Sequence, residues 1–147
     1  MADEQSPSPL SNISPGLEFS ETWPVGRFEP QTIVDGVDVV ATPEIIGCME
    51  GTVRDAVTPH LPDGYRVVGS EVECDHRAPT PAGGEVEVTV EIEAVDEEND
   101  QVVATATVTD DAGIVATGRM QHAAVDRETF GGSVERRFAE LSAAGPE

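Results

Sequence analysis

Apolar residues follow a helical period in the middle of the chain. Between Pro43 and Thr58 they recur every three or four positions, the spacing of one face of an amphipathic helix. Thr42 precedes a proline, a residue favoured in the first helical turn, so we expect the Thr42 side chain to cap the helix. Pro59 and Pro62 then end it. Its apolar positions are Ile45, Ile46, Met49, Val53, Ala56 and Val57.

From Tyr65 onward the apolar period is two, which predicts β-strands. The first strand would place on one face Val68, Ser70, Val72, Cys74 and His76. Three more strands are expected over residues 85–93, 101–109 and 114–125. One long helix followed by an antiparallel meander indicates an α+β fold in which a curved sheet wraps the helix. Because an open sheet leaves its edges unpaired, a partner strand or a dimer is expected.

The two ends of the chain carry weaker patterns. Residues 1–15 are rich in serine, proline and acid, which predicts a disordered or loosely held leader before a single domain over 16–147. Residues 16–40 hold one short extended segment and an ambiguous stretch. A last short helix is expected from Ser133 to Leu141.

Charge narrows the classes of function. The chain has 29 acidic residues against 8 arginines and no lysine, a net charge of -21, which repels nucleic acid and anionic membranes. The acid is spread through the predicted strands and helix, as in proteins adapted to molar salt. An acidic module for a basic partner stays open as an alternative. No apolar run approaches the roughly 20 residues that span a bilayer, and the acidic first residues are unlike a secretory signal, so we expect a cytoplasmic protein.

Few residues in the sequence offer chemistry. There is no phosphate-binding glycine loop, nucleophile elbow or metal-spaced cluster, so neither a metal nor a cofactor is expected. Cys48 and Cys74 are predicted to be buried free thiols. His76 lies on the apolar parity of its strand and Glu50 at the margin of the helix face; each is either a structural residue or a candidate acid or base.

A set of short motifs resembles one enzyme family. In order they are Ala41-Thr42-Pro43, Met49-Glu50, Val68-Gly69, Asp75-His76, Ala78-Pro79-Thr80-Pro81, Gly84 before the alternating valines, and Val125-Asp126 before Phe130. Together they resemble the fluoroacetyl-CoA thioesterase type of hotdog-fold thioesterase over roughly residues 32–130. The resemblance implies a hotdog fold, a homodimer with a higher oligomer left open, and acyl-CoA as substrate.

The resemblance also implies a catalytic trio. The family's catalytic residues fall on Thr42, Glu50 and His76, and Gly69 matches the glycine whose N–H holds the thioester carbonyl. Thioester hydrolysis needs a positioned water or carboxylate, an oxyanion donor and an imidazole that manages the leaving thiolate. Glu50 would be base or nucleophile, His76 acid or charge stabiliser, and Thr42 the orienting hydroxyl.

Two departures from the family pattern concern the substrate. The stretch Val34–Asp38 has no aromatic residue where the family's fluoroacetate-specific member has an aromatic lid, which removes the sequence basis for fluoroacetyl selectivity. His122 stands where the family has an arginine. Arg119 is the candidate to substitute for it, unless the strand is regular at Met120, in which case the two side chains project to opposite faces. Among the arginines, the expected anchors for the phosphates of coenzyme A are Arg77, Arg119, Arg136 and Arg137.

Helix geometry bears on how the trio assembles. Eight residues separate Thr42 from Glu50, which is about 12 Å along a helix axis, so the two side chains cannot meet through the helix alone. Either the preceding chain folds back or the site is completed across a dimer. The sequence thus predicts a thioesterase for small acyl-CoA substrates; the alternative is a non-catalytic hotdog protein that binds acyl-CoA or a related ligand.

Overall fold

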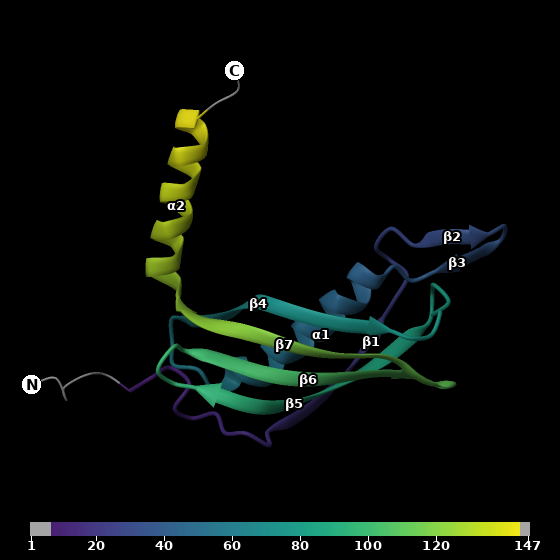
Figure 1. The fold of residues 1–147 in the computed structure, drawn as a ribbon, viewed down its shortest axis with the longest axis horizontal. Helices are drawn as coiled ribbons and strands as arrows, with labels where there is room; N and C mark the ends of the chain where they lie inside the picture. The colour runs from purple at the N-terminus through teal and green to yellow at the C-terminus, as the bar shows by residue number, and fades with distance from the viewer. Residues whose placement is uncertain (1–6, 145–147) are drawn as a thin grey trace, which may run out of the picture.

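One curved antiparallel sheet covers a single central helix (Figure 1). The computed structural model describes residues 7–144 of the chain. The elements, in chain order, are β1 (Glu18–Pro24), β2 (Gln31–Val34), β3 (Val37–Val39), α1 (Thr42–Val57), the 3-10 turn η2 (Thr58–His60), β4 (Tyr65–His76), β5 (Glu85–Asp96), β6 (Gln101–Asp110), β7 (Gly113–Asp126) and α2 (Arg127–Ala144). The α+β fold with a wrapped central helix is therefore confirmed.

The core lies between α1 and the concave face of the sheet. The five strands follow the order β1-β5-β6-β7-β4, so β1 and β4 are the two edges. The alternating residues of β5 are buried as predicted, Val86, Val88, Val90 and Ile92 all being almost fully inaccessible. They meet the α1 face formed by Ile45, Met49, Val53 and Val57, which is completely buried. Apolar burial on this scale is the main force that holds α1 in the sheet.

A β-bulge in β4 changes which residues face the helix. The register of β4 against β7 shifts between Gly69 and Glu71, so Ser70 is an additional residue on β4. Before the bulge, Gly69 pairs with buried His122; after it, Val72 pairs with buried Met120. The predicted common face is therefore wrong in its first half: it holds after the bulge for Val72, Cys74 and His76, whereas Val68 and Ser70 lie on the outer face.

The N-terminal segment begins to pack earlier than expected. Leu10 and Ile13 are buried in the core, and the Ser8 hydroxyl donates a hydrogen bond to Asp100 Oδ1 at 2.9 Å. The prediction of a loose leader is therefore wrong for residues 7–15, because two apolar side chains outweigh the polar composition around them. Residues 1–6 of the expected leader lie outside the described part of the chain.

Both helix starts differ from the sequence prediction. The N-cap of α1 is Ala41, and Thr42 is the first helical residue, so its hydroxyl is free for another partner. Helix α2 begins at Arg127 rather than Ser133, because Asp126 Oδ1 accepts the backbone N–H groups of Glu128 and Thr129 at 3.0 and 3.1 Å. A carboxylate at this position is a strong N-cap, and it outweighs the helix-weakening pair Gly131-Gly132.

The ambiguous stretch before α1 forms a small hairpin of its own, β2 paired with β3. It joins the body through the Val39–Pro81 bridge and the hydrogen bond from Val40 N–H to Thr80 O, at 2.8 Å. The loop before it is fixed to α1, since the Glu44 carboxylate accepts the backbone N–H groups of residues 26–28 at 3.0 to 3.4 Å. The hairpin thus leads directly into Thr42.

No helix of the described residues is long and apolar enough to cross a membrane.

Candidate active site

Thr42 and His76 form one hydrogen-bonded pair. The Thr42 Oγ1 atom lies 2.9 Å from His76 Nδ1, which joins the first residue of α1 to the last residue of β4. The other ring nitrogen, His76 Nε2, is buried and has no hydrogen-bond partner among the described residues. If the threonine hydroxyl donates to Nδ1, Nε2 carries a proton that it can give away; the other tautomer makes Nε2 a base.

Glu50 lies against Gly69. A Cβ atom on Gly69 would collide with Glu50 Oε2, so only glycine leaves room for the carboxylate at this point of β4. Gly69 itself is exposed in the single subunit, and Glu50 is half-buried. The carboxylate thus lies beside a backbone segment that borders solvent, which is the arrangement expected of a group that meets a water or a substrate.

His122 lies near the Glu50 carboxylate, on the inner side of the sheet. Its side chain is 2% exposed, and Nε2 lies 3.8 Å from the point where a Gly69 Cβ would be, close to the Glu50 carboxylate. Burial, together with the nearby Arg54 guanidinium, lowers the His122 pKa to about 4. His122 is therefore a neutral imidazole at pH 7, and it does not supply the positive charge of the arginine that it replaces.

The two groups of residues lie at separate points along α1 and β4. Gly69 and His76 are about seven strand residues apart, which is roughly 20 Å, and Thr42 and Glu50 are about 12 Å apart along the helix. Within residues 7–144 the structure joins Thr42 to His76 and Glu50 to Gly69 and His122. It does not bring the predicted trio together in one subunit.

The arginines expected near the site are exposed and paired. Arg77, next to His76, forms an ion pair with Asp75 at 2.9 Å. Arg119 lies on the outer face of β7, where its Nε donates to Glu93 Oε1 at 2.9 Å. Because β7 runs regularly between these positions, Arg119 and His122 point to opposite faces. The prediction that Arg119 takes over the position of the family's arginine is therefore wrong.

The glycine next to Glu50 and the two cysteines take no part in either group of site residues. Gly51 admits the ring of Trp23, whose Nε1 donates to the buried Thr52 hydroxyl at 2.9 Å, so its small size serves packing within the chain. Cys48 is a buried free thiol as predicted, and burial raises its pKa to about 11, which removes thiolate reactivity at neutral pH. Cys74 is free but only half-buried, because β4 is an edge strand.

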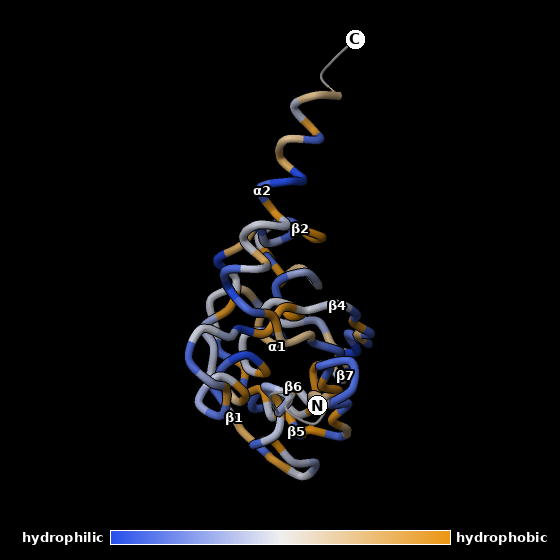
Figure 2. The backbone as a smooth tube through the Cα atoms, turned by 90° about the vertical axis from the view of Figure 1, so that its left-hand side faces the viewer, coloured by the Kyte–Doolittle hydropathy of each residue, from blue (hydrophilic) through white to orange (hydrophobic). Residues whose placement is uncertain are grey.

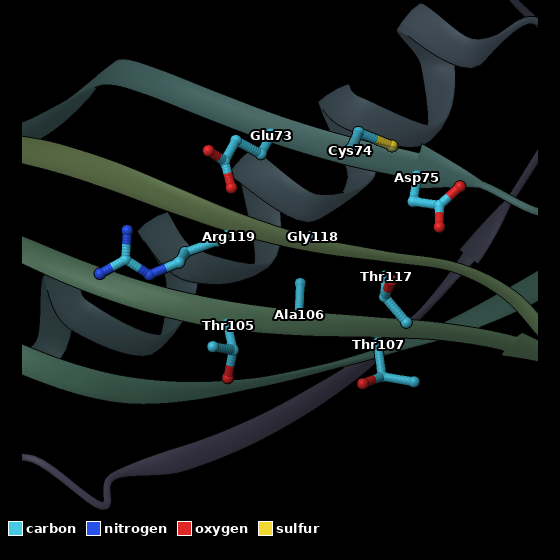
Figure 3. Close-up of a pocket in the computed structure, with 9 residues that line it drawn as sticks. All are labelled: Glu73, Cys74, Asp75, Thr105, Ala106, Thr107, Thr117, Gly118 and Arg119. Carbon is cyan, nitrogen blue, oxygen red and sulfur yellow. The ribbon is translucent and has the colours of Figure 1, made fainter.

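A shallow hollow of about 460 Å³ lies on the opposite face of the sheet. Figure 3 shows its floor at Ala106 and Gly118, with Thr105, Thr107 and Arg119 around it and α1 behind the strands. Ala106 is buried and a Cβ on Gly118 would meet Met49 of α1, so both positions face the helix and the floor of the hollow is backbone. The hollow contains none of the trio, and no group of three or more potential metal ligands occurs among the described residues.

Comparisons with known proteins agree with the resemblance drawn from the motifs. The family model described as fluoroacetyl-CoA-specific thioesterase matches residues 25–128. None of the curated proteins compared with the chain matches it.

Solved structures share the fold. The fluoroacetyl-CoA thioesterase FlK has a TM-score of 0.75 and 23% identity, over 84% of this chain and 96% of that one. A hot-dog-like protein from Thermanaerovibrio acidaminovorans has a TM-score of 0.77 and 22% identity, over 88% and 96% of the two chains. A thioesterase superfamily member from Thermus thermophilus has a TM-score of 0.78 and 23% identity, over 92% and 99%.

The matched region contains the hairpin, α1 and strands β4 to β7, and therefore every residue of the candidate site. The wrapped-helix architecture is that of the hotdog proteins. The chain belongs to the fluoroacetyl-CoA-specific thioesterase family, and it is a hotdog-fold acyl-CoA thioesterase.

Proposed function

We propose that this thioesterase hydrolyses small acyl-CoA esters as a homodimer, in which each site combines Thr42 and His76 of one subunit with Glu50 and Gly69 of the other. The observation that carries the proposal is the split of the trio into two complementary halves, one at each end of the β4 edge. Each half alone lacks a group that thioester hydrolysis requires.

The free edge of β4 offers the means of assembly. Among the described residues no strand lies beyond β4, and Val72, on the helix-facing side of this edge, is 42% exposed. Antiparallel pairing of two β4 strands about Glu73 would set Val72 opposite Cys74 of the partner subunit. Counted past the additional residue Ser70, the same register sets Gly69 opposite His76 of the partner subunit.

In this arrangement the chemistry has a defined order. Glu50 takes a proton from a water that attacks the thioester carbon, and the Gly69 N–H stabilises the oxyanion that forms. When the carbon–sulfur bond breaks, His76 Nε2 delivers a proton to the leaving thiolate and Thr42 holds the ring through Nδ1. The products are the free acid and the free thiol of coenzyme A.

The substrate side of the proposal follows from the hairpin and the arginines. Residues 34–38 span the hairpin turn and the strand ends beside it and carry no aromatic side chain, so we assign a small acyl group without selectivity for fluorine. Arg77 lies one residue beyond His76 and is exposed, which suits it to bind a phosphate of coenzyme A.

Salt adaptation belongs to the same proposal. A β4 pair centred on Glu73 aligns Glu71, Glu73 and Asp75 with their copies on the outer face, where like charges repel. At 1 M ionic strength the Debye length is about 3 Å, so such a seam is stable only in concentrated salt. We therefore assign the enzyme to the cytoplasm of a cell with molar internal salt.

Thiol release from acyl-CoA substrates of increasing chain length tests the activity. In molar salt we expect the fastest turnover with the shortest acyl groups, and losses of about 10²-fold or more in Glu50→Gln and His76→Ala. His60→Ala is the matched control, because His60 lies in the η2 turn away from both halves of the site. No hydrolysis with any chain length would leave only ligand binding, and would overturn the proposal.

Mixing two inactive variants tests the shared site. Glu50→Gln and His76→Ala are combined in dilute salt and returned to molar salt, which allows subunits to exchange. Each mixed dimer then contains one intact site, so about one quarter of the wild-type rate returns. If the mixture stays inactive although mixed dimers form, each site is built within one subunit.

A further inference from the structure

His122 is a buried polar side chain that the proposed mechanism does not use. It is 2% exposed, and its Nδ1 atom is buried without a hydrogen-bond partner among the described residues. Burial of an imidazole costs free energy unless another interaction of the ring offsets the loss of water. The ring therefore has to gain its polar interaction through the second nitrogen, Nε2.

The Nε2 atom of His122 lies within reach of the Glu50 carboxylate. This nitrogen and Glu50 Oε2 are both within 4 Å of the point where a Gly69 Cβ would be. At such a spacing an imidazole N–H binds a carboxylate directly or through one bridging water. His122 is thus the polar side chain on the buried side of Glu50, opposite the backbone that borders solvent.

The charged groups near His122 come from α1. Its neighbours in the sheet, on β4 and β6, are uncharged. Figure 2 shows β4 and β7 along one side of α1, and the charged side chains that α1 brings towards the ring are Glu50 and Arg54. Arg54 is exposed and already paired with Asp55, at 3.7 Å. Glu50 takes part in none of the ion pairs formed within residues 7–144.

The nearby carboxylate favours one tautomer of the ring. Burial, with Arg54 nearby, lowers the His122 pKa to about 4, so at pH 7 the ring is neutral and carries one proton. On Nδ1 this proton would be buried without an acceptor, whereas on Nε2 it faces Glu50. A proton beside a carboxylate is electrostatically favoured over a buried proton with no acceptor. His122 is therefore a hydrogen-bond donor at Nε2.

A neutral donor suits a carboxylate that acts as a base. Glu50 is half-buried, and a long side chain at such a margin loses rotamer freedom when its carboxylate is held in one place. A hydrogen bond to one oxygen fixes the carboxylate and leaves the second oxygen for the attacking water. A cation in the same position would favour the charged form more strongly, which would make the carboxylate a weaker base.

We propose that His122 is a positioning residue of this thioesterase, whose neutral imidazole donates Nε2–H to Glu50, directly or through one water, and holds the carboxylate against Gly69. The ring keeps its proton throughout turnover, while Glu50 accepts the proton that leaves the water. The inference rests on the role of Glu50 as base in the proposed function. It does not depend on how the subunits pair, because all three residues belong to one chain.

Two amides of different reach test the role of His122. The amide nitrogen of glutamine can take the position of Nε2, whereas that of asparagine ends near Nδ1. In molar salt we expect kcat for a short acyl-CoA to stay within about threefold of wild type in His122→Gln. It should fall by about tenfold or more in His122→Asn, with KM changed less than about twofold. His122→Leu, which has no polar atom, should behave like His122→Asn and replaces it if the buried amide prevents folding.

The pH dependence of the rate separates positioning from packing. His122→Leu removes a donor from the charged carboxylate, so the low-pH limb of kcat/KM should move to higher pH, whereas His122→Gln should keep the wild-type limb. A variant that only loosened the packing would lose rate equally at every pH. Equal rates and equal limbs in His122→Gln and His122→Leu, both folded by circular dichroism, would overturn the proposal.

Nuclear magnetic resonance of isotopically labelled histidine measures the tautomer without turnover. At pH 7 we expect the His122 proton on Nε2, with a ring signal that moves in Glu50→Gln. A proton on Nδ1 would overturn the proposal. The proposed function fails separately: a fully active Glu50→Gln removes the base itself, whereas an inactive Glu50→Gln beside equal His122 variants leaves the base and removes only the positioning role.

Discussion

The two helices show how differently one sequence pattern can be used. Helices α1 and α2 have 16 and 18 residues, and each presents an apolar stripe. The α1 stripe is completely buried against the sheet, whereas the α2 stripe is exposed along its whole length, at Phe130, Val134, Phe138 and Leu141. A periodic pattern therefore predicts that a helix has a binding face, but it does not say whether the partner of that face belongs to the same chain.

Matched valines give the largest expected contrast. Val53 of α1 is 0% exposed and Val134 of α2 is 39% exposed. Val53→Asp buries an unpaired charge and should cost more than about 4 kcal/mol, enough to unfold the subunit. Val134→Asp should change the free energy of unfolding of the subunit by less than about 1 kcal/mol.

Urea unfolding at a protein concentration that keeps the subunits apart measures both valine variants. If Val134→Asp destabilises the isolated subunit as much as Val53→Asp does, the α2 stripe is also buried within the subunit and the contrast between the two helices is wrong.

Acid should destabilise the folded subunit through the buried imidazole of His122. The His122 pKa is about 4 in the folded protein against 6.5 for a free imidazole, so the unfolded chain binds the proton first. The contribution of neutral His122 to the free energy of unfolding is complete above pH 6.5. It is lost as the pH falls towards 4, by up to about 3 kcal/mol. Unfolding free energies at pH 7 and pH 4.5 should converge in His122→Gln, whereas His60→Gln should keep the wild-type difference.

Glycine substitutions distinguish the site from the rest of β4. Gly69→Ala places a methyl group where the Glu50 carboxylate lies, so turnover should fall by about tenfold or more while the sheet stays folded. Gly64→Ala, in an open turn before β4 with φ +87, is the strained control that touches no site residue. Thiol-release rates and circular dichroism measure both, and an active Gly69→Ala would remove Glu50 from the mechanism.

A carboxylate beside α1 should respond to alkali. Burial, with Asp55 nearby, raises the Glu21 pKa from 4.5 to about 7, so the folded protein holds this proton more tightly than the unfolded chain. The stabilisation from protonated Glu21 is present in full below pH 4.5 and is lost as the pH rises through 7. Glu21→Gln should therefore raise the melting temperature by about 2–4 °C at pH 8, with no gain at pH 4.5.

The smallest effect is expected in α2 itself. A methyl group on Gly132 would have no other atom within 4 Å, so Gly132→Ala should stabilise α2 by about 0.5–1 kcal/mol. Gly118→Ala is the contrasting change in the core, because its methyl group would collide with Met49. Far-UV circular dichroism and urea unfolding should show opposite signs for the two variants.

Periodicity sufficed to predict the core elements. The valines of β5 and the apolar face of α1 lie where the pattern placed them, since burial of a long regular stripe dominates local detail. The predicted start of α2 at Ser133 was wrong because the pair Gly131-Gly132 disfavours a helix. Asp126, an acidic N-cap residue that begins the helix, is nevertheless visible in the sequence. The hairpin was ambiguous because its apolar residues face outward.

The site was harder to predict because it depends on pairing across the fold. Thr42 suggested a helix cap, and only the approach of β4 gives its hydroxyl to His76. The position of Arg119 relative to His122 depended on the regularity of β7, which no single-sequence pattern establishes. The separation of Thr42 from Glu50 was predicted correctly because it depends only on the geometry of the helix that holds both residues.

The additional residue Ser70 sets a rule for how this strand can vary. Gly69 and His76 are an odd number of positions apart, so on an unbroken strand they would project to opposite sides of the sheet. The bulge restores them to one side. Deletion of Ser70 together with its bulge would leave Gly69 and His76 six positions apart on a regular strand and still on one side. Deletion of one residue between Glu71 and Asp75 that kept the bulge would place them on opposite sides, so the proposed site fixes the length of β4 after the bulge as well as its residue types.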